Sequence, residues 1–165
     1  MKTYNIILFI VLQGFISVIF SQEIRDGFKI LRENQEVVFE DLNWDDYGDY
    51  PLNKKGERLF NPSSRFSSIE KLKRIENALF SEQERNNMRT NYRPRAMITV
   101  RASDGKIVTN RFYFQNLQDP SVIDTKKLKK LNERVKEELM IENLLFNGEK
   151  AASGYIVGHI WFFKH

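Results

Sequence analysis

Residues 96–114 read AMITVRASDGKIVTNRFYF, and this stretch decides the fold. Two strand-like runs flank the dipeptide Asp104-Gly105. Asp-Gly between two such runs is a strong signal for a β-hairpin, because glycine accepts the positive φ angle that the turn requires. The sequence therefore predicts two antiparallel strands joined by this turn. The apolar residues that we expect on one face of each strand are Ile98 and Val100 in the first, and Val108, Phe112 and Phe114 in the second.

Two amphipathic helices flank the hairpin in the sequence. The first is predicted to begin at Ser67, where the S-x-x-E spacing to Glu70 is typical of a capping box, and to fray in the polar residues 81–91. The second is predicted from about Asp124, which can cap it, to Asn143. Apolar residues recur in both at helical spacing. They are Ile69, Leu72, Ile75 and Leu79 in the first, and Leu128, Leu131, Val135 and Leu139 in the second.

The last apolar run, residues 154–163 (GYIVGHIWFF), predicts a final strand that is apolar on both faces. Such a strand is either central and covered, or an edge that receives a partner. The expected fold class is α+β: a small antiparallel sheet, made of the hairpin and the C-terminal strand, packed by two amphipathic helices. Before the first helix we expect a helical turn or loop over 22–33, a short strand over 35–39 and a loop over 40–66.

The N-terminus has the order of a secretory signal peptide. Lys2 is followed by the apolar run 6–20 and then by the small residue Ser21. The run has 15 positions, whereas a membrane-spanning helix needs roughly 20 apolar residues, so cleavage after Ser21 is favoured over retention as an anchor. The predicted organisation is a signal peptide over 1–21, a strand and an acidic aromatic loop over 22–66, and an α+β domain over 67–165.

Composition narrows the function classes. The chain has no Cys, which excludes thiol catalysis, thiolate metal sites and disulfides, and packing alone must stabilise an exported domain. The net charge is +4, and the basic excess lies in residues 61–111, which hold 11 basic and 5 acidic residues. In an exported protein such a region favours an anionic glycan or lipid headgroup over nucleic acid. We expect no cofactor.

The acidic aromatic loop offers a first candidate site. Asp41 begins a calcium-loop pattern, but Asp46 stands where that pattern requires glycine, so an EF-hand is excluded. Asp45 and Asp46 can still be a carboxylate pair for glycoside hydrolysis, and Trp44 beside them can stack on a sugar. The alternative is that the carboxylates are solvated and that the aromatic residues, which include Tyr47 and Tyr50, pack the loop onto the domain.

Arginines offer a second candidate site, which would bind anions. Arginine binds phosphate and carboxylate bidentately. Arg101 and Arg111 lie off the apolar faces of the two hairpin strands, so we expect them to share the open face of the sheet. The alternative is ordinary surface charge. The arginines of this candidate site are Arg93, Arg95, Arg101 and Arg111.

Residues 92–163 follow the order Tyr-x-Pro, strand, Asp-Gly turn, strand, helix, Asn-Gly turn and strand, through ITVRASDGKIVTNRFYF, VIDTKKLKKLNERV and NGEKAASGYIVGHIWFF. This order resembles the C-terminal domain of TonB-type proteins, with Ile123-Asp124 in place of the leucine-aspartate pair that opens the helix in that family. The resemblance implies a non-enzymatic domain that pairs strands with peptides of outer-membrane transporters. The chain lacks the proline-rich spacer and the aromatic-x-Pro after the helix, so we expect the fold and strand pairing without energy transduction.

Together these features predict an exported protein, periplasmic or secreted, that is not an integral membrane protein after cleavage. It would act as a non-catalytic binding module, pairing an exposed strand with an envelope or outer-membrane protein. The alternative is a small secreted hydrolase or glycan-binding protein that uses the loop at 40–50.

Overall fold

The computed structural model describes residues 23–66 and 69–164. The expected signal peptide and the predicted helix start at Ser67 lie outside the described residues. The strands are β1 (Glu23–Arg25), β2 (Phe28–Glu33), β3 (Glu36–Asp41), β4 (Pro62–Phe66), β5 (Arg95–Arg101), β6 (Ile107–Gln115), β7 (Ile141–Phe146) and β8 (Tyr155–Trp161). The helices are α2 (Ile69–Leu79), α3 (Glu82–Asn87) and α4 (Thr125–Glu138), with short helical turns η1 (Trp44–Asp46), η2 (Met88–Tyr92) and η3 (Pro120–Val122).

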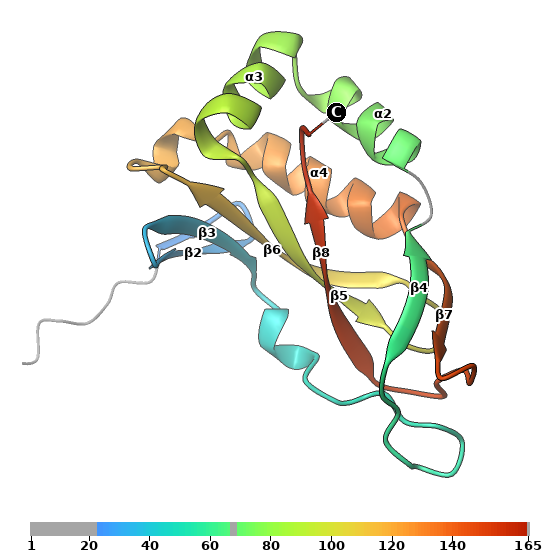
Figure 1. Cartoon of the computed structure of the whole chain (residues 1–165). Helices are drawn as coiled ribbons and strands as arrows, with labels where there is room; N and C mark the ends of the chain where they lie inside the picture. Colours follow the sequence, from blue (N-terminus) through green and yellow to red (C-terminus); the bar gives the residue numbers. More distant parts are fainter. Residues whose placement is uncertain (1–22, 67–68, 165) are drawn as a thin grey trace, which may run out of the picture.

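Six strands form one antiparallel sheet in the order β1-β2-β3-β6-β5-β8, and β4 pairs with β7 in a separate two-stranded sheet (Figure 1). The α+β class is confirmed, and so are the β5–β6 hairpin and the place of the last strand beside it. The expected size is wrong: the sheet has six strands in place of three. Three α-helices are described in place of two.

The N-terminal part of the chain differs most from expectation. Residues 22–33 were expected to form a helical turn or loop, but the described residues 23–33 form β1 and β2 around a turn at Asp26-Gly27, where both φ angles are positive. β3 then pairs with β6, so the strands before residue 66 belong to the same sheet as the hairpin. The expected boundary between residues 66 and 67 therefore does not separate two structural units.

Two further segments form regular structure that the sequence reasoning did not predict. The expected loop over 40–66 contains β4, which pairs with β7. The polar residues 81–91 do not fray: Ser81 accepts a hydrogen bond from Glu84 N, and the Glu84 side chain accepts one from Ser81 N, so a capping box starts α3. Helix α4 ends at Glu138 instead of Asn143, because the chain turns at Leu139 into β7.

The turn of the β5–β6 hairpin requires its glycine. Gly105 has a φ angle of +75°. A Cβ atom built on it would lie 2.0 Å from the carbonyl oxygen of Ile141, because the Gly105 carbonyl accepts a hydrogen bond from Ile141 N at 2.8 Å. This close backbone approach ties the hairpin turn to the first residue of β7.

The core lies between the large sheet and the helices, and phenylalanine rings fill much of it. Phe28, Phe39, Phe112 and Phe114 are all almost completely buried. Phe39 meets Phe28 and Phe114 edge to face, with ring centroids 6.3 and 5.4 Å apart. Edge-to-face pairs add about 0.5–1.5 kcal/mol each to the burial of apolar area. Helices α2 and α4 complete the core with Leu72, Ile75, Leu128, Leu131 and Val135.

A buried polar cluster joins β3, β6 and α4. The Asp41 carboxylate accepts hydrogen bonds from Thr109 Oγ1 and Asn110 N, both at 2.9 Å, and from Asn132 Nδ2 at 2.8 Å. The Lys136 ammonium lies 2.6 Å from the same carboxylate. One carboxylate thus gives the end of β3, the middle of β6 and α4 a shared acceptor.

Replacing Asp41 with alanine should leave these donors without their acceptor. Removal of one partner from a buried charged network costs about 3–5 kcal/mol, so we expect the free energy of unfolding of D41A to fall by about that amount. Urea denaturation at neutral pH, followed by circular dichroism, measures it. Exposed Asp45 supplies the matched control, since D45A should change the value by less than about 0.5 kcal/mol. Equal losses in both variants would contradict the role given to Asp41.

Candidate functional site

β8 is an edge strand. It pairs with β5 in continuous register from Arg95 opposite Trp161 to Arg101 opposite Tyr155. In the described part of the chain no strand pairs with its other edge. An unpaired edge exposes a row of backbone N–H and C=O groups that can template another strand.

The backbone groups of β8 point alternately toward β5 and toward the open edge. At one end of the strand, Phe162 N donates to Pro94 O at 3.2 Å, and at the other, Gly154 O accepts from Ala102 N at 2.9 Å. The backbone N–H and C=O groups of the even-numbered residues therefore point toward β5. The residues of β8 that present their N–H and C=O groups outward are Tyr155, Val157, His159 and Trp161.

The 49–52 segment covers the open edge at the start of β8. Tyr155 N, which points outward, donates to Asp49 O at 2.9 Å. Gly154 permits this approach: its φ angle is +86°, and a Cβ atom there would lie 2.0 Å from Tyr50 O. The first outward group is therefore already used, and the free stretch begins at Val157.

A buried carboxylate covers the other end of the edge. Phe163 N, which also points outward, donates to Glu76 Oε1 at 2.9 Å. Phe163 has a φ angle of +55°, which is unusual for a bulky residue, and its ring packs edge to face on Phe80 with centroids 5.1 Å apart. Burial raises the pKa of Glu76, although the Phe163 N–H and the Arg85 guanidinium act in the opposite direction. Three outward-facing residues thus remain between two occupied ends.

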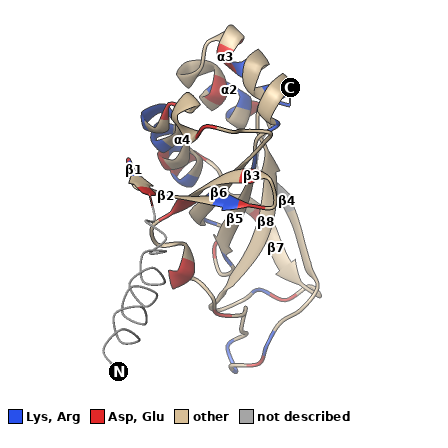
Figure 2. Cartoon of the chain, turned by 90° about the vertical axis from the view of Figure 1, so that its left-hand side faces the viewer, with Lys and Arg blue, Asp and Glu red and all other residues tan. Residues whose placement is uncertain are grey.

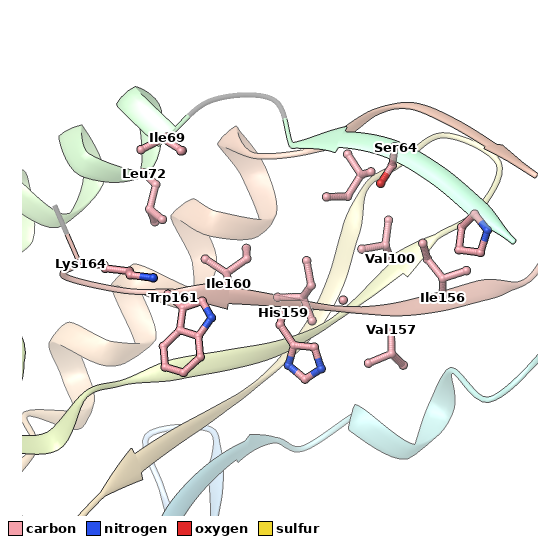
Figure 3. A pocket seen from close by; sticks show the side chains of 14 residues that line it. Ser64, Ile69, Leu72, Val100, Ile156, Val157, His159, Ile160, Trp161 and Lys164 are labelled. Atoms are coloured by element: carbon pink, nitrogen blue, oxygen red, sulfur yellow. The ribbon is translucent and has the colours of Figure 1, made fainter.

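An apolar groove of about 500 Å³ runs beside this edge (Figure 3). Pro62 and Ser64 of β4 line one side, and β8 lines the other. Apolar residues from α2, β5 and β8 make up most of the remaining lining. They include Ile69, Leu72, Ile98, Val100, Ile156 and Ile160.

Gly158 sits in the middle of the edge strand and keeps the groove open. A Cβ atom on Gly158 would make only ordinary contact with Ile98, at 3.5 Å from Cγ1. Steric crowding therefore does not require glycine at this position. Its missing side chain leaves Ile98 on the neighbouring strand as part of the groove wall.

The opposite face of β8 carries exposed apolar side chains. Val157 is 56% exposed and Trp161 is 47% exposed, with exposed His159 between them. The Lys164 ammonium lies 5.7 Å from the centroid of the Trp161 ring. Apolar surface is thus available on both sides of the free backbone edge.

The structure does not gather the four candidate arginines into one site. Arg95 forms an ion pair with Glu36 at 2.7 Å and lies over the Tyr113 ring. Arg111 also approaches that ring, but it pairs with Glu40 at 2.7 Å and with Glu33. Arg101 pairs with Asp104 at the hairpin turn, at 3.0 Å. Arg93 is exposed and forms no ion pair with a described residue. The pairing acids therefore neutralise three of the four guanidinium groups.

The acidic aromatic loop lies against the sheet. Trp44 is half-buried on η1, with the Arg111 guanidinium 6.0 Å from its ring, while Asp45 and Asp46 beside it are exposed. The Tyr47 ring lies 5.0 Å from that of Tyr155. The structure thus uses Trp44 and Tyr47 to pack the loop and leaves both carboxylates in solvent. Among residues 23–66 and 69–164, no three His, Asp or Glu side chains gather to hold a metal ion.

Sequence reasoning missed Glu76 and β4. Glu76 follows Ile75 and is buried on the same side of α2 as the apolar stripe. An acidic side chain among the apolar positions of a helix is a signal for a buried carboxylate. β4 begins at Pro62, and proline next to Asn61 favoured a loop over a strand. None of the described helices has the length and apolar composition needed to cross a membrane.

Comparison with known proteins supplies a likeness of fold. The crystal structure of a DUF5043 family protein from Bacteroides uniformis ATCC 8492 aligns with this chain at a TM-score of 0.57 and 12% sequence identity. The alignment covers 84% of this chain and 87% of that protein. No protein-family model matches the sequence, and no curated protein does. At this identity the likeness shows the fold alone, and the TonB resemblance stays a prediction.

Glu76 should make stability depend on pH. In the unfolded chain its carboxyl ionises at the ordinary pKa of 4.5, whereas in the folded chain the pKa is raised. As the pH rises above 4.5, the unfolded state therefore loses this proton first, and the folded state loses stability until the pH passes the raised pKa. Urea denaturation across this pH range should show that the free energy of unfolding falls as the pH rises. This decrease should be absent from E76Q, which keeps an acceptor for Phe163 N. An unchanged pH profile in E76Q would contradict this account.

Proposed function

We propose that this protein is an exported binding module that takes up an extended segment of a partner protein on the free edge of β8. The observation that carries the proposal is the coincidence of three backbone positions, which no described strand pairs, with an apolar groove directly beside them. Strand addition uses these two features together. Main-chain hydrogen bonds supply affinity, and pockets for alternate side chains supply specificity.

The geometry supports a short segment. Val157, His159 and Trp161 span two strand repeats, and with its flanking residues a segment of roughly five or six residues covers such a length. Alternate side chains of the bound segment would enter the groove above Ile98. The others would lie beside the exposed Val157 and Trp161 side chains.

The N-terminal sequence supports export, because residues 1–21 have the order of a secretory signal peptide. An envelope or outer-membrane protein is the partner we propose. This interpretation shares strand pairing with the TonB resemblance but assigns no energy transduction to the chain.

No specific observation favours the hydrolase or glycan-binding alternative. Glycoside hydrolysis uses two carboxylates held at a defined distance around the sugar, one of them with a raised pKa. Asp45 and Asp46 are both exposed, and the ring beside them, Trp44, is half-covered by the sheet. The anion-binding alternative loses Arg95, Arg101 and Arg111 to their acidic partners.

A proline at position 159 tests the proposal directly. The N–H of His159 faces outward, so H159P removes an edge donor without breaking a hydrogen bond to β5. We expect cross-linking in the native cells, followed by stringent purification and mass spectrometry, to recover one specific partner with the wild-type protein and to lose it with H159P.

His159→Ala is the matched control, since it removes the imidazole but keeps the amide, and it should retain the partner. Thermal unfolding should confirm that both variants fold. Capture of the same partner by H159P at the wild-type level, or the absence of any specific partner, would contradict strand pairing.

A further inference from the structure

We infer that the segment taken up on β8 carries an Asp or Glu side chain at the end that lies beside Trp161. This inference rests on the proposed function and names the chemistry of its partner. It is carried by a second hollow, of about 210 Å³, at the C-terminal end of the edge strand. Arg89, Arg93, Pro94, Trp161, Phe162 and Lys164 line this hollow.

The hollow and the groove share part of their linings. Trp161 and Lys164 line both spaces, so a strand that leaves the free edge at Trp161 meets the hollow next. Among the residues that the structure describes, no Asp or Glu lines either the groove or the hollow. The groove is therefore mostly apolar along the strand, and the hollow at the Trp161 end is lined by cations, while the Glu76 carboxylate closes the backbone edge itself at Phe163.

The three cations of the hollow lack acidic partners among the described residues. The Arg89 guanidinium donates to Asn86 Oδ1 at 3.0 Å, and the Lys164 ammonium lies over the Trp161 ring. Arg93 is exposed and makes no ion pair within the described chain. The guanidinium groups of Arg95, Arg101 and Arg111, by contrast, are all paired with acids.

The local backbone sets the position of the Arg93 main chain, whose side chain lines the hollow. Arg93 ends the π-helical turn η2 with a left-handed φ angle of +40°, and its N–H donates to Met88 O at 2.9 Å. Arg89 lies one turn earlier in the same element. On its other side Arg89 borders a separate hollow with Glu76 and Glu82, so Arg93 and Lys164 carry most of the uncompensated charge.

Charge complementarity selects the partner. Guanidinium groups bind carboxylates through short, charge-assisted hydrogen bonds, and a basic segment at this end would be repelled. A side-chain carboxylate reaches the hollow from a segment bound in either direction, whereas a terminal carboxylate requires a parallel one. The partner segment should therefore carry apolar residues at every second position, where they lie over the groove. It should also carry an internal Asp or Glu at one end.

A display library of random ten-residue segments, flanked on both sides by Gly-Ser so that no free terminus is present, tests the inference on the full mature chain. We expect the wild-type protein to enrich alternating apolar segments with an acidic residue at one fixed position. The amide version of a selected segment, with Asp→Asn or Glu→Gln, should bind about tenfold more weakly.

The triple variant R89Q, R93N and K164Q should lose the acidic preference while still enriching apolar strands. Asparagine is chosen at position 93 because it tolerates a left-handed φ angle. The matched control is K126Q, K129Q and K130Q, which removes three exposed charges from α4, where basic residues gather (Figure 2), and should keep the preference.

The outcomes separate this inference from the proposed function. Alternating segments without an acidic preference, or a preference that survives in the R89Q, R93N and K164Q variant, would overturn the inference alone. Failure to enrich any segment whose binding H159P abolishes would overturn both.

Discussion

The backbone pairing between β5 and β8 fixes the direction of every group at the proposed binding edge. Because β5 uses the even-numbered residues from Gly154 to Phe162, the odd-numbered ones face outward. The fold then occupies the first and last of these with its own acceptors, Asp49 O and Glu76 Oε1. The backbone edge from Val157 to Trp161 remains open, and residues of β4 and α2 line the groove beside it.

Local sequence signals were sufficient to predict an element where a turn signal and a periodic apolar pattern agreed. Asp104-Gly105 predicted the hairpin, and helical spacing predicted α2 and α4, because these signals act over a few residues. The two apolar faces of 154–163 left two possibilities, a central strand or an edge, and the sheet order resolves them as an edge. The same type of signal, Asp26-Gly27 before a run with apolar Phe28 and Ile30, also stands at the start of β2, where the prediction was a helical turn or loop.

The remaining features depend on long-range contacts that spacing does not reveal. Whether an arginine is free depends on which acid faces it across the sheet: Arg111 meets Glu40 of β3, while Arg93 meets no acid in the described chain. The groove likewise arises from β4, β5, β8 and α2, which are distant in sequence. Of the three cations in the hollow, the sequence analysis therefore predicted only Arg93 as a binding residue.

Amide hydrogen exchange measured by NMR on the free, folded protein tests the central claim most directly. If β8 is an open edge, the amides of Val157, His159 and Trp161 exchange rapidly, while those of Ile156, Gly158 and Ile160 are protected by β5. Addition of a bound segment should then slow the three fast amides selectively. Equal protection of odd- and even-numbered amides in the free protein would show that the edge is already covered and would contradict the account.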